Sequence, residues 1–316
     1  MINVLESTKY VVDNSRFVKI NRDKIKELAG EWNSSKLVIP GWDVKYHFFD
    51  DSEKTCEYLF VLDSINFCFW AKNENDKWKI DYNGKKIGGY NALAFLLKKL
   101  FGNRNFSSFS EFTYSEFRKL FYGEKEIPLI KERFDILQEN YKILKNKHSG
   151  KFSILIEACD YDVLRILPEL VDNFSSFRDE VEYKRKKIAF YKRAQILIGD
   201  LYCAFGGKKW GNLKNLEKLT MFADYKIPQI LRGYGILEYA DSLGNKINNR
   251  ELILPDSEEE VEIRANTIWA GEFIKEELRK NGINMRSFKI DWVLWNQAQE
   301  KGVDLKPHHF TETIFY

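Results

Sequence analysis

The chain has 316 residues, of which 44% are hydrophobic and 15% aromatic, so it is long enough to bury a large core. Fifty Lys and Arg against 47 Asp and Glu give a formal charge of +3, a balance that argues against a broad nucleic-acid surface and is compatible with a small anionic substrate. The four cysteines form no Cys-x-x-Cys pair, which argues against a disulfide framework or a cysteine metal site and predicts buried, reduced thiols.

The start of the chain lacks the basic and apolar regions of a signal peptide, and no apolar run reaches membrane-spanning length. We therefore expect a cytoplasmic protein without membrane contact. No internal repeat or low-complexity tract interrupts the sequence, and it contains only 6 prolines. This continuity predicts one compact catalytic unit over residues 1–316, with an α+β portion over 1–90 and a helical core over 91–316.

The N-terminal third contains two patterns typical of strands. Residues 58–62 form an apolar run of strand length, and residues 78–87 are typical of a hairpin that turns at Asn83-Gly84. These patterns predict a small antiparallel sheet in this part of the chain.

Helical periodicity dominates after residue 91 and predicts a mostly α, or α+β, fold. The range 258–280 carries the clearest end signals, because Ser257 and Glu260 match a capping box and Gly282 follows the last periodic residue. The helices expected from this pattern are 91–101, 127–147, 161–171, 181–205, 228–240, 258–280 and 289–300.

Residues 188–205 are apolar nearly all the way round a helical wheel, which predicts a buried helix. Lys192 and Gln195 lie on one side of the wheel, and Arg193 and Asp200 lie on the neighbouring side at an i,i+7 spacing. A buried charge needs a partner, so either a structural ion pair between Arg193 and Asp200 or a ligand has to satisfy these groups.

A carboxylate stands among apolar residues in the segment 220–228. Asp224 can be the N-cap of a helix that has Pro228 in its first turn. The same carboxylate, fixed in an apolar pocket, is also suited to stabilising a developing cation. Both interpretations stay open at this point.

Polar residues also interrupt the apolar run 61–70. Asn66 can both donate and accept hydrogen bonds, as recognition of a purine-like edge requires, whereas Asp63 can simply form a turn. Phe67 and Trp70 are suited either to core packing or to stacking on a base.

The C-terminal quarter adds polar groups among aromatic residues. Glu260 and Arg264 have the i,i+4 spacing of an ordinary surface ion pair. The groups singled out are Glu262, Arg264 and Trp269 on the capped helix, Asp291 with Trp292 and Trp295, and His309.

The strings VLDSINFCFW, FYKRAQILIGD, TMFADYKIPQIL, VEIRA and TIFY, in this order and spacing, resemble the queuosine salvage proteins, which are queuosine 5′-phosphate N-glycosidases. The resemblance covers about residues 63–316. It implies an overall shape similar to that of helical DNA glycosylases. It also implies that the lysine of FYKRAQ and the aspartate of FADY, here Lys192 and Asp224, lie in the active site.

The tail departs from this resemblance. The family pattern His-Arg-x-Arg corresponds here to His309-Phe310-Thr311-Glu312. A phosphate contact from that tail is therefore in doubt, and Lys192, Arg193, Lys226 or Arg264 become the candidates for it.

The resemblance implies cleavage between ribose and a 7-deazaguanine base, which passes through an oxocarbenium-like sugar. Asp224 is then expected to act as general base or to form a transient sugar ester, with Lys192 beside it. No metal or other cofactor is expected, and the partner is a nucleotide rather than a nucleic acid. The residues expected to bind substrate are Asn66, Asp63, Phe67, Trp70, Gln195, Arg193, Tyr225, Lys226, Arg264, Asp291, Trp295 and His309.

Two other functions were compatible with parts of the sequence. Residues 231–235 are similar to a helix-hairpin-helix turn, as in a DNA base glycosylase, but Asp224 precedes that segment instead of following it. The other alternative is a module that binds queuine or a modified nucleotide without cleaving it.

Overall fold

The computed structural model describes residues 1–32, 37–299 and 305–316. Over these residues the chain is mostly helical, and its strands pair in three small antiparallel sheets. The sheets pair β1 with β6, β2 with β3, and β4 with β5. The predicted mostly helical fold with a small antiparallel sheet in the N-terminal third is thereby confirmed, and the β1–β6 and β4–β5 sheets are additional to that prediction.

The α-helices are α1 Val4–Asn14, α2 Arg22–Glu31, α3 Glu53–Ser64, α4 Gly89–Asn103, α5 Tyr114–Leu120, α6 Ile130–Lys147, α7 Phe152–Ala158, α8 Val163–Asn173, α9 Lys192–Ala204, α10 Lys226–Gly233, α11 Asp241–Asn248, α12 Glu258–Lys280 and α13 Ser287–Gln297. The strands are β1 Val18–Ile20, β2 Lys79–Tyr82, β3 Lys85–Gly88, β4 Glu180–Tyr183, β5 Lys186–Ala189 and β6 Leu237–Tyr239.

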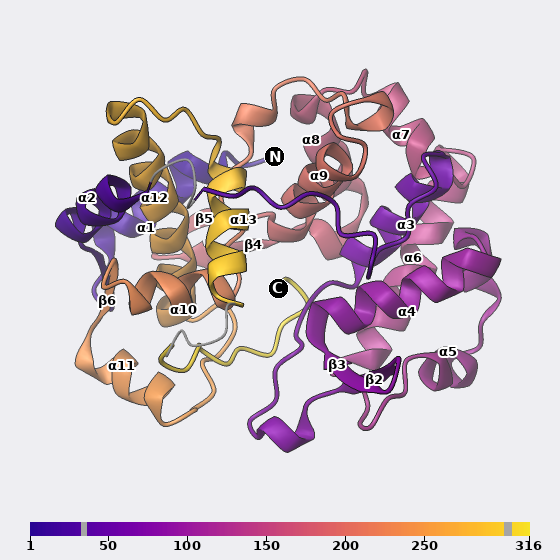
Figure 1. The fold of residues 1–316 in the computed structure, drawn as a ribbon, viewed down its shortest axis with the longest axis horizontal. Coiled ribbons are helices and arrows are strands. Elements are labelled where there is room, and N and C mark those ends of the chain that lie inside the picture. The colour runs from indigo at the N-terminus through magenta and orange to yellow at the C-terminus, as the bar shows by residue number, and fades with distance from the viewer. Residues whose placement is uncertain (33–36, 300–304) are drawn as a thin grey trace.

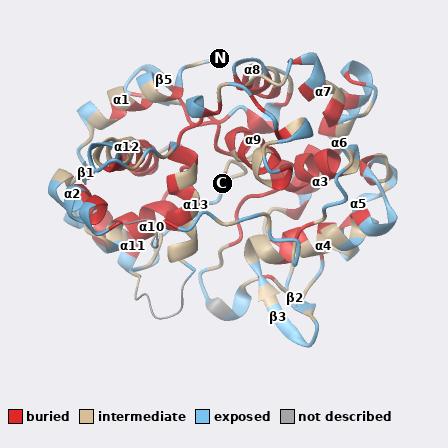
Figure 2. Ribbon diagram, turned by 45° about the horizontal axis from the view of Figure 1, so that its top comes forward, coloured by how far each residue is buried: buried red, intermediate tan, exposed pale blue. Residues whose placement is uncertain are grey.

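Buried apolar side chains form two clusters, and the helices gather around them in two groups (Figure 1). The first cluster is built mainly from α3, α4 and α6 to α9, and the second from α2 and α10 to α13. Helix α12 contributes to both. Buried residues continue from one group to the other in Figure 2, and the C-terminal end of the chain lies between the groups in both views.

The first residues of the chain pack against its last third. Strand β1 pairs with β6, and the carboxylate of Glu262 on α12 accepts the backbone N–H groups of Arg16, Phe17 and Val18 at 3.0, 2.6 and 3.2 Å. Because a buried carboxylate needs hydrogen-bond donors, these bonds fix the N-terminal segment on α12.

The strand predicted at 58–62 was wrong, because these residues lie inside helix α3. Ser52 caps this helix by accepting the N–H of Lys54, and every residue from Thr55 to Ser64 is buried. A helix buried on all sides has no polar face, so its apolar run has the same pattern as a buried strand.

Two predicted helices were too long at one end. In the range 181–205, β4 and β5 form a hairpin that turns through Lys184 and Arg185, both at positive φ, and α9 begins only at Lys192. In the range 228–240, α10 ends at Gly233, and the chain turns through Gly235, at φ 70°, into β6. Both turns use left-handed backbone that hydrophobic periodicity does not reveal.

The other predicted helices and the hairpin at Asn83-Gly84 were confirmed. Ser257 caps α12 by accepting the N–H of Glu260 at 3.3 Å, and Gly282, at φ 80°, follows its end. The confirmed ranges are 91–101, 127–147, 161–171, 258–280 and 289–300, of which residue 300 lies outside the described residues. The sequence patterns did not reveal α1, α2, α5, α7 and α11.

The structure also bears on the cysteines and on membrane contact. Cys56, Cys68 and Cys159 are buried, Cys203 is half-buried, and all four are free thiols. Among the described residues, no helix combines the length and apolarity needed to span a bilayer.

Candidate active site

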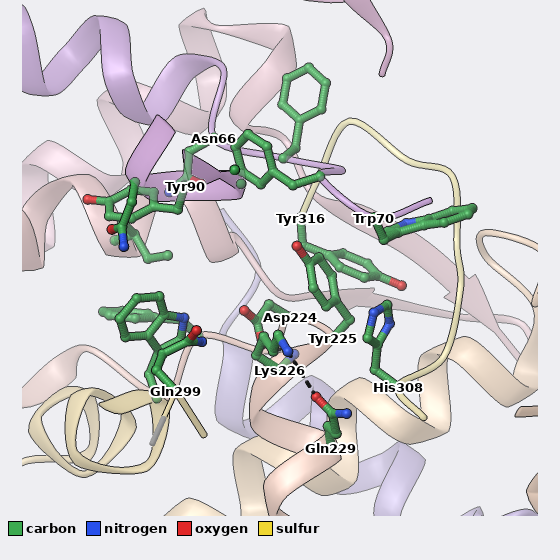
Figure 3. Close-up of a pocket in the computed structure, with 18 of the residues that line it drawn as sticks. Asn66, Trp70, Tyr90, Asp224, Tyr225, Lys226, Gln229, Gln299, His308 and Tyr316 are labelled. Atoms are coloured by element: carbon green, nitrogen blue, oxygen red, sulfur yellow. Dashed lines mark hydrogen bonds between the residues drawn. The ribbon is translucent and has the colours of Figure 1, made fainter. Parts of the chain in front are cut away.

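A cavity of about 750 Å³ lies between the two groups of helices, and Figure 3 shows residues of its wall. Its wall is built from parts of the chain that are distant in sequence: residues 40–47 before α3, residues 66–79 after it, the start of α4, helix α9, residues 222–229 at the start of α10, Arg250, and α13 with the C-terminal tail. A concave, aromatic-rich cavity of this size with a few converging polar groups is typical of a small-molecule site.

Lys192 enters the cavity wall from the first position of α9. The preceding residue, Tyr191, has a left-handed backbone with φ 51°, and the N–H of Lys192 donates to the Asp179 carboxylate at 3.3 Å. Only 5% of Lys192 is exposed. Burial lowers the pKa of its ammonium group, and the nearby carboxylates of Asp224 and Asp63 oppose that effect.

Asp224 precedes α10 and also lines the cavity. Its Oδ1 accepts the N–H groups of Lys226 at 2.8 Å and Ile227 at 2.9 Å, so this carboxylate does cap the helix. Both bonds use Oδ1, which means that the cap does not need Oδ2. Burial raises the pKa of Asp224, while the charge of Lys192 and the two backbone bonds act in the opposite direction. The cap and a role at a substrate are therefore compatible with each other.

Two further carboxyl groups, Asp291 and Asp200, share the cavity wall. Asp291 accepts the N–H of Phe222 at 2.9 Å, which ties α13 to the segment that carries Asp224. Burial and the neighbouring charge of Asp224 raise the pKa of Asp291 well above its usual range. The cavity wall thus contains one buried lysine and the carboxyl groups of Asp224, Asp291 and Asp200. Ionising all three carboxyl groups together costs free energy, because one positive charge does not balance them.

Close packing around Gly199 brings two aromatic rings into the wall. A Cβ atom at this position would lie 3.2 Å from Phe222 Cζ and 3.4 Å from Trp292 Cζ2. Since the first contact is tighter than ordinary van der Waals contact and the second is at its lower limit, a residue without a side chain lets both rings approach α9.

Asn66 lies in a turn that two buried arginines hold in place. Arg133 donates to the carbonyl oxygens of Ile65, Phe67 and Cys68. Arg193 donates to the carbonyl oxygens of the two residues just before this turn, 63 and 64, and to that of residue 176. The two guanidinium groups lie 4.2 and 5.0 Å from the ring centroid of Phe67. This clamp fixes the direction of Asn66, whose amide also donates to Asp63 at 3.3 Å.

The residues predicted for substrate binding divide into two sets. The set that lines the cavity, together with Lys192 and Asp224, is Asn66, Phe67, Trp70, Tyr225, Lys226, Asp291 and Trp295. The set behind the wall is Asp63, Gln195, Arg193, Arg264 and His309. In this second set Gln195 exchanges hydrogen bonds with Thr220, and His309 Nε2 lies 3.3 Å from the hydroxyl of Tyr316.

The interpretation of Glu260 and Arg264 as a surface pair was wrong, because 2% of each residue is exposed. Arg264 forms hydrogen bonds with Asp179, and its guanidinium lies between the rings of Phe190 and Tyr316, 3.9 and 4.5 Å from their centroids. The open question about Arg193 and Asp200 is also answered, since Arg193 binds backbone carbonyls and Asp200 contacts Tyr90.

One end of the cavity contains a chain of polar groups that the sequence analysis missed. Tyr90 Oη lies 2.9 Å from His47 Nε2 and 3.4 Å from Asp200 Oδ2, and Trp295 packs edge-on against the Tyr90 ring. The three groups come from segments far apart in the chain, so no local spacing connects them.

The other end is cationic and aromatic, and Figure 3 shows Asp224 between Tyr90 and His308 in that view. Lys77, Lys226 and Arg250 line the cavity near His308. Burial, together with these three positive charges, lowers the pKa of His308 to about 4, against a backbone hydrogen bond that raises it. Of these four residues, sequence analysis had singled out only Lys226.

Aromatic rings cover this cationic end. His308 packs between Tyr225 and Phe310, with both centroid distances 4.7 Å, and Phe310 stacks on Trp70 at 4.8 Å. The Trp70 indole donates to the carbonyl of Thr311 at 3.0 Å. These contacts place the C-terminal tail in the wall through its aromatic residues.

The arrangement offers a fixed carboxylate, a buried ammonium, further carboxyl groups and aromatic surface in one cavity. Among the described residues, no group of three or more His, Cys, Asp or Glu side chains is placed to hold a metal ion. The side chains present are those of acid–base and electrostatic catalysis on a small polar ligand.

Comparison with known proteins agrees with the sequence resemblance. A family model described as "Queuosine salvage protein" matches residues 46–316. A protein of Sphaerobacter thermophilus named queuosine 5′-phosphate N-glycosylase/hydrolase is 38% identical over 319 residues, covering 100% of this chain and 98% of the relative. A Mus musculus protein of the same name is 34% identical over 336 residues, with 98% of each chain covered. The chain therefore belongs to the queuosine salvage protein family.

Proposed function

We propose that the chain is an N-glycosidase that hydrolyses queuosine 5′-phosphate to queuine and ribose 5-phosphate. The observation that carries this proposal is that Asp224 and Lys192 both lie in the wall of one aromatic cavity and that their charges interact, in a chain whose curated relatives are named for this activity. Neither a DNA base glycosylase nor a non-catalytic binding module is favoured by these relatives.

Asp224 supplies negative charge beside the sugar. As the bond between C1′ and the base breaks, positive charge develops on the sugar ring, and a fixed carboxylate stabilises that charge without having to reorganise. The two backbone N–H groups that hold Oδ1 provide this fixation. Asp224 either takes a proton from the attacking water or bonds transiently to C1′, and Lys192 keeps enough of the carboxylate ionised to do so.

The cavity has a polarity that fits a nucleotide. Lys77, Lys226 and Arg250 surround one end and are suited to the 5′-phosphate, whereas the end near Tyr90 and Trp295 is aromatic and offers hydrogen bonds to a base. The sugar then lies near Asp224, between these ends. In this proposal these cations provide the phosphate contact in place of the tail, where Phe310 stands at a position that is arginine in the family pattern.

Incubation of the purified protein with queuosine 5′-phosphate, followed by mass-spectrometric measurement of free queuine, tests the proposal. We expect release from the mononucleotide and none from intact queuosine-containing tRNA, because a cavity of about 750 Å³ has room for a nucleotide and not for a folded nucleic acid. Absence of queuine in the first reaction overturns the proposed activity. Tight, salt-sensitive tRNA binding would support a nucleic-acid substrate instead.

We also propose that the helical core shares the shape of helical DNA glycosylases, that residues 1–316 unfold as one unit, and that the protein acts in the cytoplasm as a soluble enzyme on a free nucleotide. The cavity supports the second of these points, because its wall combines buried members of the first cluster with Trp295 and Leu305, which pack against the second. A single calorimetric transition with equal calorimetric and van't Hoff enthalpies is the expected result.

A further inference from the structure

The hydrogen-bond chain at the base end of the cavity determines where its protons lie. His47 Nδ1 is 2.9 Å from the carbonyl oxygen of Asp43, which can only accept, so Nδ1 carries a hydrogen. Burial lowers the pKa of His47, which keeps the imidazole neutral and makes Nε2 an acceptor. The group facing Nε2 at 2.9 Å is the hydroxyl of Tyr90.

Tyr90 has one phenolic proton and two neighbours that can accept it. The contact with His47 Nε2 is 2.9 Å and the contact with Asp200 Oδ2 is 3.4 Å, so the shorter contact identifies His47 as the acceptor in the free protein. The Tyr90 proton is then not available to stabilise an Asp200 carboxylate. A proton between the Tyr90 and Asp200 oxygens has to come from Asp200 itself.

The surroundings of Asp200 also favour its neutral form. It is 7% exposed, and burial raises its pKa to about 7, although Tyr90 and the charge of Lys192 act in the opposite direction. Donation by Tyr90 to His47 weakens the first of these opposing effects. The ionisable groups that face the chain are Tyr58, Asp63, Tyr90, Lys192 and Cys203 around Asp200, and Asp43, Tyr58 and Lys98 around His47.

Asp200 lies on the same helix as Lys192 but eight positions further along, which is about 12 Å at a rise of ~1.5 Å per residue. Lys192 faces Asp224, where the sugar is placed in the proposed function. For a nucleotide whose sugar lies beside Asp224, Asp200 is therefore expected near the edge of the base that is opposite the glycosidic bond, which we call the far edge.

We propose that Asp200 is the acid that protonates the departing base at the carbonyl oxygen of its far edge, and that Tyr90 and His47 are positioning residues that keep this acid protonated. The inference rests on the proposed function. In a 7-deazaguanine, the glycosidic nitrogen is conjugated through the ring to that carbonyl oxygen. An acid at the far edge can therefore stabilise the electron pair left by the broken bond.

The step balances in atoms and charge. The bond between C1′ and the ring nitrogen breaks, its electron pair moves through the ring to the carbonyl oxygen, and Asp200 transfers its proton to that oxygen. The enol form of the base returns to the keto form by exchanging protons with water. Water adds its hydroxyl to C1′ and gives its second proton to Asp224, and both carboxyl groups return to their starting states by exchange with solvent.

The first test uses the dependence of kcat/KM on pH. Wild type should lose activity as the pH rises through the pKa of Asp200, because the acid is then ionised. In His47→Leu the Tyr90 proton turns to Asp200 and stabilises its carboxylate, so this alkaline loss should move to lower pH. The added substitution Tyr90→Phe should cancel that movement, and His47→Gln, which keeps an acceptor, should resemble wild type. Tyr82→Phe on the β2–β3 hairpin is the matched control.

An unmoved alkaline limb in His47→Leu, or an equal movement in the double variant, overturns the assignment of Tyr90 and His47. Should His47→Leu fail to fold, Asp200→Asn tests the acid directly, because the amide keeps the size of the side chain but has no acidic proton. We expect kcat/KM at pH 6 to fall by about 10²-fold and the alkaline limb to disappear. Wild-type values in this variant overturn the proposal.

A second readout needs no turnover. The infrared carbonyl band of the protonated Asp200 carboxyl, identified as the band that Asp200→Asn lacks, should titrate near the same pH in wild type and at lower pH in His47→Leu. If the protein shows this band but releases no queuine, the proposed function is wrong and the acid role of Asp200 falls with it. If the protein is active but lacks the band, only the acid role of Asp200 is wrong.

Discussion

The carboxylate of Asp179 binds the guanidinium of Arg264 through two hydrogen bonds, of 3.0 and 2.5 Å. Both residues are almost fully buried, at 4% and 2% exposure. Asp179 also accepts the N–H of Lys192, so one carboxylate connects helix α12 with the first residue of α9. The position of Lys192 in the cavity therefore depends on a charge pair outside the cavity wall.

Replacement of Asp179 by alanine should strongly destabilise the fold. Arg264 would lose its bidentate partner and keep the Glu260 carboxyl at 3.4 Å and the Ala223 carbonyl oxygen at 3.3 Å, so a buried charge would be left poorly compensated. Breaking a buried pair in this way typically costs about 3–5 kcal/mol. The free energy of unfolding in urea measures the effect. Asp135→Ala, which removes an exposed i,i+4 pair with Lys131, is the control and should cost less than about 1 kcal/mol.

Asp224→Asn should separate binding from catalysis. The amide keeps the helix cap but loses the charge that opposes the developing cation, so turnover should fall by about 10²–10⁴-fold or more. The Kd for queuosine 5′-phosphate should change far less, because the charge acts mainly in the transition state. Queuine release and calorimetric binding measure the two quantities.

The matched control for that variant is Asp162→Asn, at the cap of α8, where the carboxylate accepts the N–H of Leu164 outside the cavity. Its turnover should equal that of wild type. Turnover near the wild-type rate in Asp224→Asn itself would remove Asp224 from the mechanism and leave it only as a helix cap.

The sequence indicated the centre of this site because Lys192 and Asp224 are charges within apolar segments, and a buried charge is visible in a pattern. At the polar ends of the cavity the sequence singled out only Asp200 and Lys226, and it gave no indication of the groups that lie beside them. His47, Tyr90 and Asp200 meet only through tertiary packing, and Arg250 lies in a loop of ordinary polar composition. Their spacing along the chain contains no information about their distance in space.

The errors in secondary structure have related causes. Helix α3 is buried on every side, so its sequence has the apolar continuity of a strand. The starts of α9 and β6 depend on single residues with left-handed backbone, Tyr191 beside Lys192 and Gly235 before the strand. Periodicity describes the interior of an element and not the turn that precedes it.

Lys192→Met should move the acid side of the pH profile. The charge of Lys192 lowers the pKa of Asp224, so its removal should raise that pKa, and the catalytic carboxylate should be lost at a higher pH than in wild type. The plot of kcat/KM against pH measures the shift. Lys289→Met, a half-buried lysine on α13 outside the cavity wall, should leave the acid side in place. A profile that shifts to lower pH in Lys192→Met would contradict the electrostatic role.

The cationic end of the cavity should determine the preference for a nucleotide over its nucleoside. Arg250 donates to the carbonyl oxygen of Lys72 at 2.8 Å, and Arg250→Gln keeps a donor for this bond but removes the positive charge. Lys226→Gln likewise removes a positive charge, here the one beside His308. A hydrogen bond to a charged group contributes about 1.5–3 kcal/mol, and partial exposure reduces this, so KM for queuosine 5′-phosphate should rise roughly 10-fold in each variant. KM for queuosine, which has no phosphate, should stay near the wild-type value.

Added salt should also reduce the preference of the wild-type protein for the nucleotide over the nucleoside. Lys85→Ala, an exposed lysine on the nearby hairpin that does not line the cavity, is the control for a general loss of positive charge. Equal changes in KM for the nucleotide and the nucleoside would place the phosphate elsewhere in the cavity.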